Sequence, residues 1–227
     1  MMSQVRIGVL LYLPVGWFSP SITSGTPAHQ PTGRLGNVEH VVTRNPEDAK
    51  RRILAAATAE FAAHGIAGAR MDRVAERATS SKERIYAYFG NKDELFDIVY
   101  TASIRDTLDA VKFNAHDLPA YVGRMFDYFA DNPDSQRLTI WYRLERPTGP
   151  GLNAVIEANE ARIAALAGAQ ADGLVTTRFT PGELLTLIQA MAASWNTLNP
   201  EFARTGHMGD REHRRDAVME AVARLIA

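Results

Sequence analysis

The chain has 227 residues, of which 46% are hydrophobic and 22% charged, so it can bury a core and is not typical of a disordered protein. It has no cysteine, which excludes disulfides, thiolate metal sites and cysteine nucleophiles and fits a reducing cytoplasm. The formal net charge of −1 argues against a polycation that coats nucleic acid, although a balanced total can conceal a local basic face.

Residues 1–45 are rich in Gly, Pro, Ser and Thr and show no helical periodicity, so we expect a flexible arm. Within it, the segment from Val5 to Phe18 is apolar, but it contains Arg6 and Pro14 and is shorter than the roughly 20 residues that a membrane helix needs. Three interpretations stay open: a genuine extension, a start assigned too early, or a secretory signal.

The first predicted helix begins after Asn45, which is a favourable N-cap, and Pro46 suits the first helical position. Apolar residues recur every four positions from Ile53 to Phe61, which indicates one buried face. Gly65 supplies a C-terminal stop. The pattern therefore predicts a helix of about five turns that packs through one side.

Two shorter helices follow, near residues 71–78 and 82–89, with Ser81 as the N-cap of the second. Asn91 caps a longer helix that begins at Lys92. Three short helices in about 45 residues have the proportions of a helix-turn-helix, whose third helix enters the major groove of DNA.

The predicted third helix has two chemically different faces. Ile85 and Phe89 lie four positions apart on a face suited to burial, whereas Lys82, Glu83 and Tyr86 lie opposite. Exposed basic and aromatic hydroxyl side chains suit contacts with phosphates and base edges. The sequence therefore indicates a DNA-binding helix.

The remainder of the chain is predicted to be helical as well, which makes the fold class all-α. The only fragment that resembles a strand, residues 175–179, is too short and isolated to form a sheet. The predicted helices cover residues 92–114, 118–131, 134–146, 152–170, 181–197 and 210–226.

Residues 49–96 resemble the DNA-binding domain of the TetR-type (TetR/AcrR) transcriptional regulators. The segment SKERIYAYFGNKDELF (81–96) carries the strongest similarity, supported by ILAAATAEFAAHGIAG (53–68) and RVAERA (73–78). After the arm at 1–45, the resemblance implies a helix-turn-helix domain (46–96) and a C-terminal helical bundle for ligand sensing and dimerisation (97–227).

The resemblance also implies which residues contact DNA: Lys82 and Tyr86 the backbone, Glu83 and Arg84 the base edges, and Tyr88 and Lys92 phosphates. The full set of expected DNA-binding residues is Arg70, Ser81, Lys82, Glu83, Arg84, Tyr86, Tyr88 and Lys92. The chain departs from the family pattern at Thr79-Ser80, where Gly-Val is usual, and at Ala69-Arg70, where two Thr are common. Arg70 could replace a lost phosphate contact.

Family members pair through their last two helices and bind small molecules within the C-terminal bundle, so two residue sets are expected there. The expected dimer interface consists of Leu184, Leu187, Ile188, Met191, Val218, Val222 and Leu225. The expected ligand pocket consists of Met125, Phe126, Phe129, Trp141, Tyr142 and Trp195. Ordinary core packing is the alternative for each residue, and no ligand role is assigned to the charged residues Arg143, Glu145 and Arg146.

Catalysis, cofactors and metals are not predicted. His207 and His213 are six positions apart, which does not place two ligands on one helical face. No nucleophile elbow, phosphate loop or dinucleotide fingerprint occurs.

The leading hypothesis is a cytoplasmic homodimeric repressor that binds double-stranded operator DNA and is released by an unknown small molecule, with no membrane partner. The alternative is a helical small-molecule-binding or protein-interaction module that does not use its helix-turn-helix for DNA. Replacing Lys82 and Tyr86 with Ala would discriminate between them, because only a DNA-binding regulator would lose control of transcription.

Overall fold

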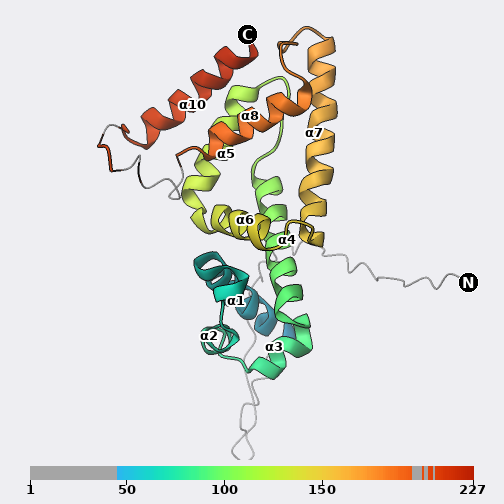
Figure 1. Cartoon of the computed structure of the whole chain (residues 1–227), viewed down its shortest axis with the longest axis vertical. Coiled ribbons are helices and arrows are strands. Elements are labelled where there is room, and N and C mark those ends of the chain that lie inside the picture. Colours follow the sequence, from blue (N-terminus) through green and yellow to red (C-terminus); the bar gives the residue numbers. More distant parts are fainter. Residues whose placement is uncertain (1–44, 196–200, 202–203, 207) are drawn as a thin grey trace, which may run out of the picture. The chain divides into compact units, whose positions relative to one another are not determined.

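The computed structural model describes residues 45–195, 201, 204–206 and 208–227, and all regular structure in these ranges is helical (Figure 1). This confirms the predicted all-α class. The expectations for residues 1–44 lie outside the described residues. None of the helices in the described ranges has both the length and the apolar character that crossing a membrane requires.

The N-terminal helices begin at the predicted residues because polar side chains cap them. The Asn45 side chain accepts a hydrogen bond from the Glu47 amide, and Asn91 forms a reciprocal capping box with Glu94. Ser81 accepts from the Arg84 amide in the same way. The resulting helices are α1 (Pro46–Gly68), α2 (Met71–Arg77), α3 (Lys82–Phe89) and α4 (Lys92–Ala110).

The C-terminal helices also follow the predicted order. They are α5 (Leu118–Asp131), α6 (Pro133–Glu145), the short 3-10 helix η1 (Pro150–Leu152), α7 (Asn153–Ala171), α8 (Pro181–Ala193) and α10 (Arg211–Ile226). Most of the predicted ends in residues 92–227 lie within one residue of the observed ones, but the ends of α4 and α8 differ by four residues. Helix α4 stops at Ala110 instead of continuing to residue 114, because Val111 leaves the helical conformation and buries its side chain in the C-terminal core. Helix α8 ends at Ala193 instead of continuing to residue 197.

The first hydrophobic core joins helices α1 to α4 with α6, and Figure 1 shows α6 lying across the end of this group. The Phe61 and Phe96 rings are 4.8 Å apart, and the Phe96 and Tyr142 rings 5.3 Å. Leu138 and Tyr142 of α6 are both fully buried in this core. Helices α1 to α4 therefore depend on α6 for part of their own interior.

A kink in α1 shows how closely α6 packs. Gly65 has a φ of 64°, which breaks the helix, and a Cβ added there would lie 2.7 Å from the Trp141 ring. The Glu145 carboxylate accepts hydrogen bonds from the amides of Ile66 (2.5 Å) and Ala67 (3.1 Å). The break would otherwise leave these amides without partners, so α6 stabilises the end of α1.

The second hydrophobic core lies among α5, α7, α8 and α10. Leu118, Tyr121 and Leu166 are fully buried there. Residues 175–179 form bends instead of a strand, and the Gln170 side-chain amide donates to the carbonyls of Thr176 (2.7 Å) and Phe179 (2.8 Å). Side-chain hydrogen bonds thus replace the pairing that a strand would need.

Candidate nucleic-acid interface and cavity

The turn between α2 and α3 sets the direction of α3. The Ser80 amide donates to the Ala75 carbonyl (2.9 Å) and the Thr79 amide to the Glu76 carbonyl (3.1 Å), which is the Schellman pattern that ends many helices. Thr79 has a φ of 50°, a conformation that usually requires glycine. The Ser80 hydroxyl is buried without a hydrogen-bond partner among the described residues. The unusual Thr-Ser pair therefore keeps the turn but strains it.

Helix α3 presents a polar face to solvent. Ile85 is fully buried and Phe89 nearly so, which fixes the opposite face against the core. Tyr86 is 42% exposed although it is aromatic. The exposed residues of this segment are Ser81, Glu83, Arg84, Tyr86 and Ala87. An apolar anchor beneath exposed hydroxyl, acidic and basic groups is the arrangement that a groove-reading helix requires.

Three of the residues expected to contact the DNA backbone lie beside this face, and each makes a different contact within the protein. They are Lys82, Tyr88 and Lys92. The Lys82 ammonium forms an ion pair with Asp72 (2.6 Å), and this hydrogen bond raises the pKa of Lys82. The Tyr88 ring lies 5.7 Å from the Lys50 ammonium. Lys92 occupies the first turn of α4, where free backbone amides favour anions.

Arg70 is held in place by a residue that the sequence analysis did not select. Its amide donates to the Glu60 carboxylate (2.8 Å), which also pairs with Arg73 (2.5 Å). Glu60 is buried; burial acts to raise its pKa, but these hydrogen bonds outweigh burial and lower it. Its position in the sequence could have indicated a buried carboxylate, since Glu60 follows Ile53 by seven residues and therefore lies on the same apolar face of the helix.

Arg146, which follows the last residue of α6, forms ion pairs with α4. The Arg146 guanidinium binds Asp97 (2.7 Å) and Asp93 (2.7 Å). The Tyr142 hydroxyl also donates to Asp97 (2.6 Å). The end of α6 is thereby attached to the first two turns of α4.

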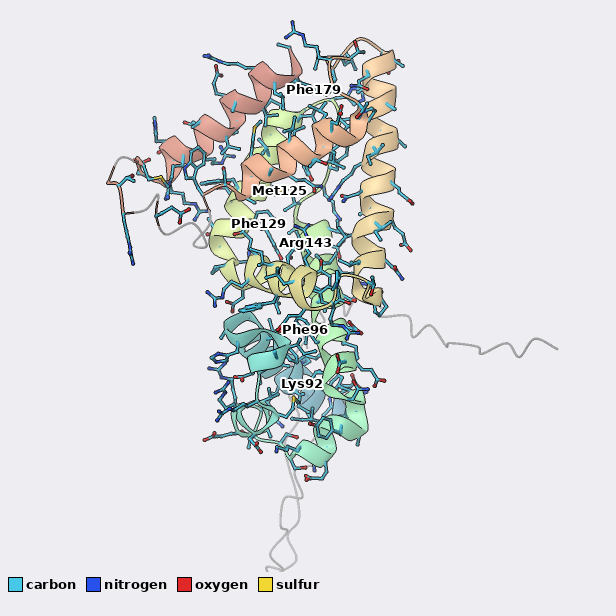
Figure 2. The ribbon with its side chains drawn as sticks, viewed as in Figure 1. Lys92, Phe96, Met125, Phe129, Arg143 and Phe179 are labelled. Atoms are coloured by element: carbon cyan, nitrogen blue, oxygen red, sulfur yellow. The ribbon has the colours of Figure 1, made fainter. Side chains whose placement is uncertain are left out.

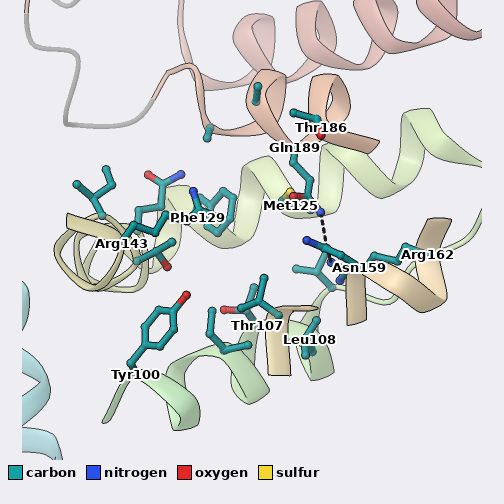
Figure 3. A pocket seen from close by; sticks show the side chains of 18 residues that line it. Tyr100, Thr107, Leu108, Met125, Phe129, Arg143, Asn159, Arg162, Thr186 and Gln189 are labelled. Atoms are coloured by element: carbon teal, nitrogen blue, oxygen red, sulfur yellow. Dashed lines mark hydrogen bonds between the residues drawn. The ribbon is translucent and has the colours of Figure 1, made fainter. Parts of the chain in front are cut away.

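A cavity of about 490 Å³ lies among α4, α5, α6, α7 and α8 (Figure 3). Met125 and Phe129 of α5, two of the residues expected in a ligand pocket, contribute apolar walls to this cavity. The labelled side chains in Figure 2 show Met125, Phe129 and Arg143 together at the level of this cavity, separate from Lys92 and Phe96. Its volume falls within the range of small-molecule sites.

The other four residues expected in the pocket do not line this cavity, which is a correction. Trp141 and Tyr142 lie on the side of α6 that packs against α1 and α4. Phe126 and Trp195 pack in or against the second core. Hydrophobicity indicated that these residues avoid water, but it did not indicate which side of the bundle covers them. Arg143, to which no role was assigned, does line the cavity.

The expected dimer residues also need correction. Four of them are buried inside the same chain, in the second core, and therefore cannot face a partner in this conformation: Leu184, Ile188, Val218 and Val222. Leu187 is 37% exposed, and Met191 and Leu225 are half-buried. The regular spacing of apolar residues on α8 and α10 therefore results mainly from packing within the chain.

The histidine expectation can be followed for one residue. His213 is exposed in the first turn of α10, where its amide donates to the Asp210 side chain (2.8 Å), whereas His207 lies outside the described residues. In the described part of the chain, no group of three or more His, Cys, Asp or Glu side chains is placed to hold a metal ion.

The comparisons with known proteins agree with the geometry. A family model described as "Bacterial regulatory proteins, tetR family" matches residues 53–99, and one described as "Tetracyclin repressor-like, C-terminal domain" matches residues 117–224. The HTH-type transcriptional repressor SCO4008 of Streptomyces coelicolor is 36% identical over 191 residues, which cover 82% of this chain and 99% of that protein.

Solved structures show the same relationship. The crystal structure of the transcriptional regulator SCO4942 of Streptomyces coelicolor is 37% identical, with a TM-score of 0.72 over 78% of this chain and 98% of its own. The fatty acid degradation regulator FadR of Bacillus halodurans, 15% identical with a TM-score of 0.56 over 76% of this chain and 97% of its own, shares the fold. This chain therefore belongs to the TetR family of bacterial regulatory proteins and is a DNA-binding transcription regulator.

Proposed function

We propose that the protein is a homodimeric repressor that acts in the cytoplasm, binds its operator through α3 and leaves it when a small molecule occupies the cavity. The observation that carries this proposal is the exposed polar face of α3 above a fully buried Ile85. The name of the related SCO4008 protein, a transcriptional repressor, supports repression.

On DNA, α3 would lie in the major groove. Arg84 and Glu83 are exposed and can reach base edges, because Arg donates two hydrogen bonds to guanine and Glu accepts from cytosine. Ser81, Tyr86 and Tyr88 would contact the backbone beside them. Lys92 and the first amides of α4 would bind one phosphate, and Arg70, exposed before α2, another.

A homodimer would place two copies of α3 on half-sites about one helical turn apart, or a multiple of that spacing. The residues available for pairing are the exposed Leu187 together with the half-buried Met191 and Leu225. Light scattering should give twice the chain mass, and Leu187→Lys should lower it towards one chain. Leu174→Lys is the control, because Leu174 is also exposed (55%) but lies in the connection before α8.

The coupling between ligand and DNA would pass through α6. One side of this helix lines the cavity with Arg143, and the other holds α1 through Trp141 and Glu145. A ligand that shifts α6 would thus shift the end of α1 and with it the DNA-binding helices. A coupling of about 1–3 kcal/mol between the two sites would be enough for release.

The test is fluorescence anisotropy of the protein with DNA from upstream of its own gene, against scrambled DNA and over a salt series. We expect specific binding that salt weakens, because phosphate contacts release counterions. Arg84→Ala should weaken specific binding by about 1–3 kcal/mol. Arg105→Ala is the matched control, since Arg105 is exposed on α4 away from α3 and the cavity.

The repressor proposal would be contradicted if the wild-type protein bound the upstream and the scrambled DNA equally weakly. The same result would have to hold for fragments that together cover the flanking genes. That result would favour the helical binding module that does not use its helix-turn-helix. Equal losses in Arg84→Ala and Arg105→Ala would show that general charge, rather than the exposed face of α3, holds the DNA.

A further inference from the structure

The side chains that line the cavity are unusual in charge. They include two arginines, Arg143 of α6 and Arg162 of α7, and no Asp, Glu, Lys or His. Arg143 is exposed, and its guanidinium forms no ion pair or hydrogen bond with any residue in the described ranges. The cavity therefore offers positive charge that nothing in the described part of the chain neutralises.

Two buried donors that line the same cavity also lack acceptors. Gln136 is 6% exposed, and its Nε2 has no hydrogen-bond partner in the described structure; the same is true of the hydroxyl of the fully buried Tyr100. The Thr139 hydroxyl near Tyr100 donates to the Ser135 carbonyl (2.9 Å), which leaves its oxygen able to accept, so the unpaired Nε2 of Gln136 is the stronger demand for an acceptor. Buried donors normally have partners, and leaving one unpaired is costly, so an acceptor is missing at this end of the cavity.

The opposite end differs, as Figure 3 shows by placing Tyr100 and Arg143 on one side and Arg162 on the other. The Arg162 guanidinium lies 5.7 Å from the centre of the Tyr121 ring. Asn159 there accepts a hydrogen bond from Gln189 (3.1 Å). The Arg162 guanidinium also donates to Asn159 (3.3 Å), whereas the buried Tyr121 hydroxyl beside it lacks a partner among the described residues. Only the Arg143 end therefore combines an unpaired guanidinium with buried donors that lack acceptors.

We propose that the effector is an organic acid whose carboxylate binds Arg143, Gln136 and Tyr100 and whose apolar body lies against Met125 and Phe129. The carboxylate supplies acceptors for all three donors, and an arginine can bind it through two parallel hydrogen bonds. A cation would meet two arginines without a counter-charge. This proposal rests on the proposed function, because it assigns a ligand class to the same cavity.

The experiment is calorimetric titration of the full-length protein with three matched probe sets. Each set has one apolar body, an octyl, naphthyl or biphenyl group, and ends in a carboxylate, a primary amide or an ammonium group. We expect at least one carboxylate to bind about ten times more tightly than its amide and ammonium counterparts, since a hydrogen bond between two charged groups is stronger than one to a neutral group. Arg143→Gln should abolish that preference, while Arg105→Gln, on the exposed side of α4, should keep it.

Gln136→Leu gives a second readout, because it removes the unpaired amide donor and should weaken the carboxylate more than the ammonium probe, which has no acceptor for that donor. The proposal is overturned if the ammonium or amide probes bind as tightly as the carboxylates, or if no carboxylate binds. Anisotropy on operator DNA with the same samples separates the two claims. A carboxylate that binds without releasing DNA keeps the ligand class and refutes the ligand-controlled repressor, whereas release by an ammonium probe does the reverse.

Discussion

Replacing Thr79 with Gly should stabilise the protein, because residue 79 occupies the left-handed region with a φ of 50°. That conformation costs a residue with a Cβ about 1–2 kcal/mol. Glycine avoids this cost but gains freedom in the unfolded chain, which offsets about 0.5–1 kcal/mol. The net gain is about 0.5–1 kcal/mol, or an increase of ~2 °C in Tm for a chain of this size. Urea unfolding at fixed protein concentration measures it.

Thr79→Ala is the matched control, since it removes the hydroxyl and one methyl group but keeps the Cβ. Thr79 is exposed, so neither substitution changes the packing of the core. If strain at φ 50° is the cause, Thr79→Gly raises the urea midpoint and Thr79→Ala leaves it within error. Equal midpoints for wild type and Thr79→Gly, or equal gains in both variants, would refute the reasoning.

Four other substitutions test neighbouring contacts. Ser80→Val should stabilise the turn by about 1 kcal/mol in the same unfolding assay, because it removes a buried hydroxyl that has no partner among the described residues; a loss would show that the site cannot take the larger side chain. Gly65→Ala should lower Tm by several degrees, since it combines a φ of 64° with a contact of 2.7 Å to Trp141; an unchanged Tm would contradict that packing. Asp72→Asn should tighten DNA binding at low salt by freeing Lys82, and anisotropy would refute this if affinity fell or stayed constant. The pKa of Glu60 is lowered on folding, so its carboxylate stabilises the protein at pH values above its ordinary pKa of 4.5, and this contribution is lost as the pH falls. Glu60→Gln should therefore make the free energy of unfolding depend less on pH below 4.5. The same pH dependence in wild type and variant would argue against the effect.

The local parts of the fold could be predicted from sequence because their causes are local. Asn45, Ser81 and Asn91 cap helices through amides two or three residues away, so the residue types sufficed to place the helix starts. The two buried positions of α3, Ile85 and Phe89, followed from spacing alone.

Positions that depend on tertiary packing could not be predicted in the same way. The spacing of Leu184 and Val218 showed that both avoid water, but the same pattern suits a core and an interface, and here the core covers them. Arg143 looked like one member of a charged cluster, because sequence does not indicate that its neighbours turn away towards α1 and α4. Glu60 was missed because the residues that hydrogen-bond its carboxylate, Arg70 and Arg73, lie beyond the end of α1.

The position of α6 has a consequence for how such regulators can be recombined. A chimera joined at the predicted boundary after Phe96 would interrupt α4 and would also separate the DNA-binding helices from Leu138 and Tyr142, which fill their core. The folding unit that contains the DNA-binding helices is therefore discontinuous in sequence, since it consists of α1 to α4 and one face of α6. An exchange of ligand specificity should therefore transfer α5, α7 and α8 and keep the face of α6 that carries Leu138 and Tyr142. Evolution or design can then change the face of α6 that lines the cavity without disrupting the first hydrophobic core.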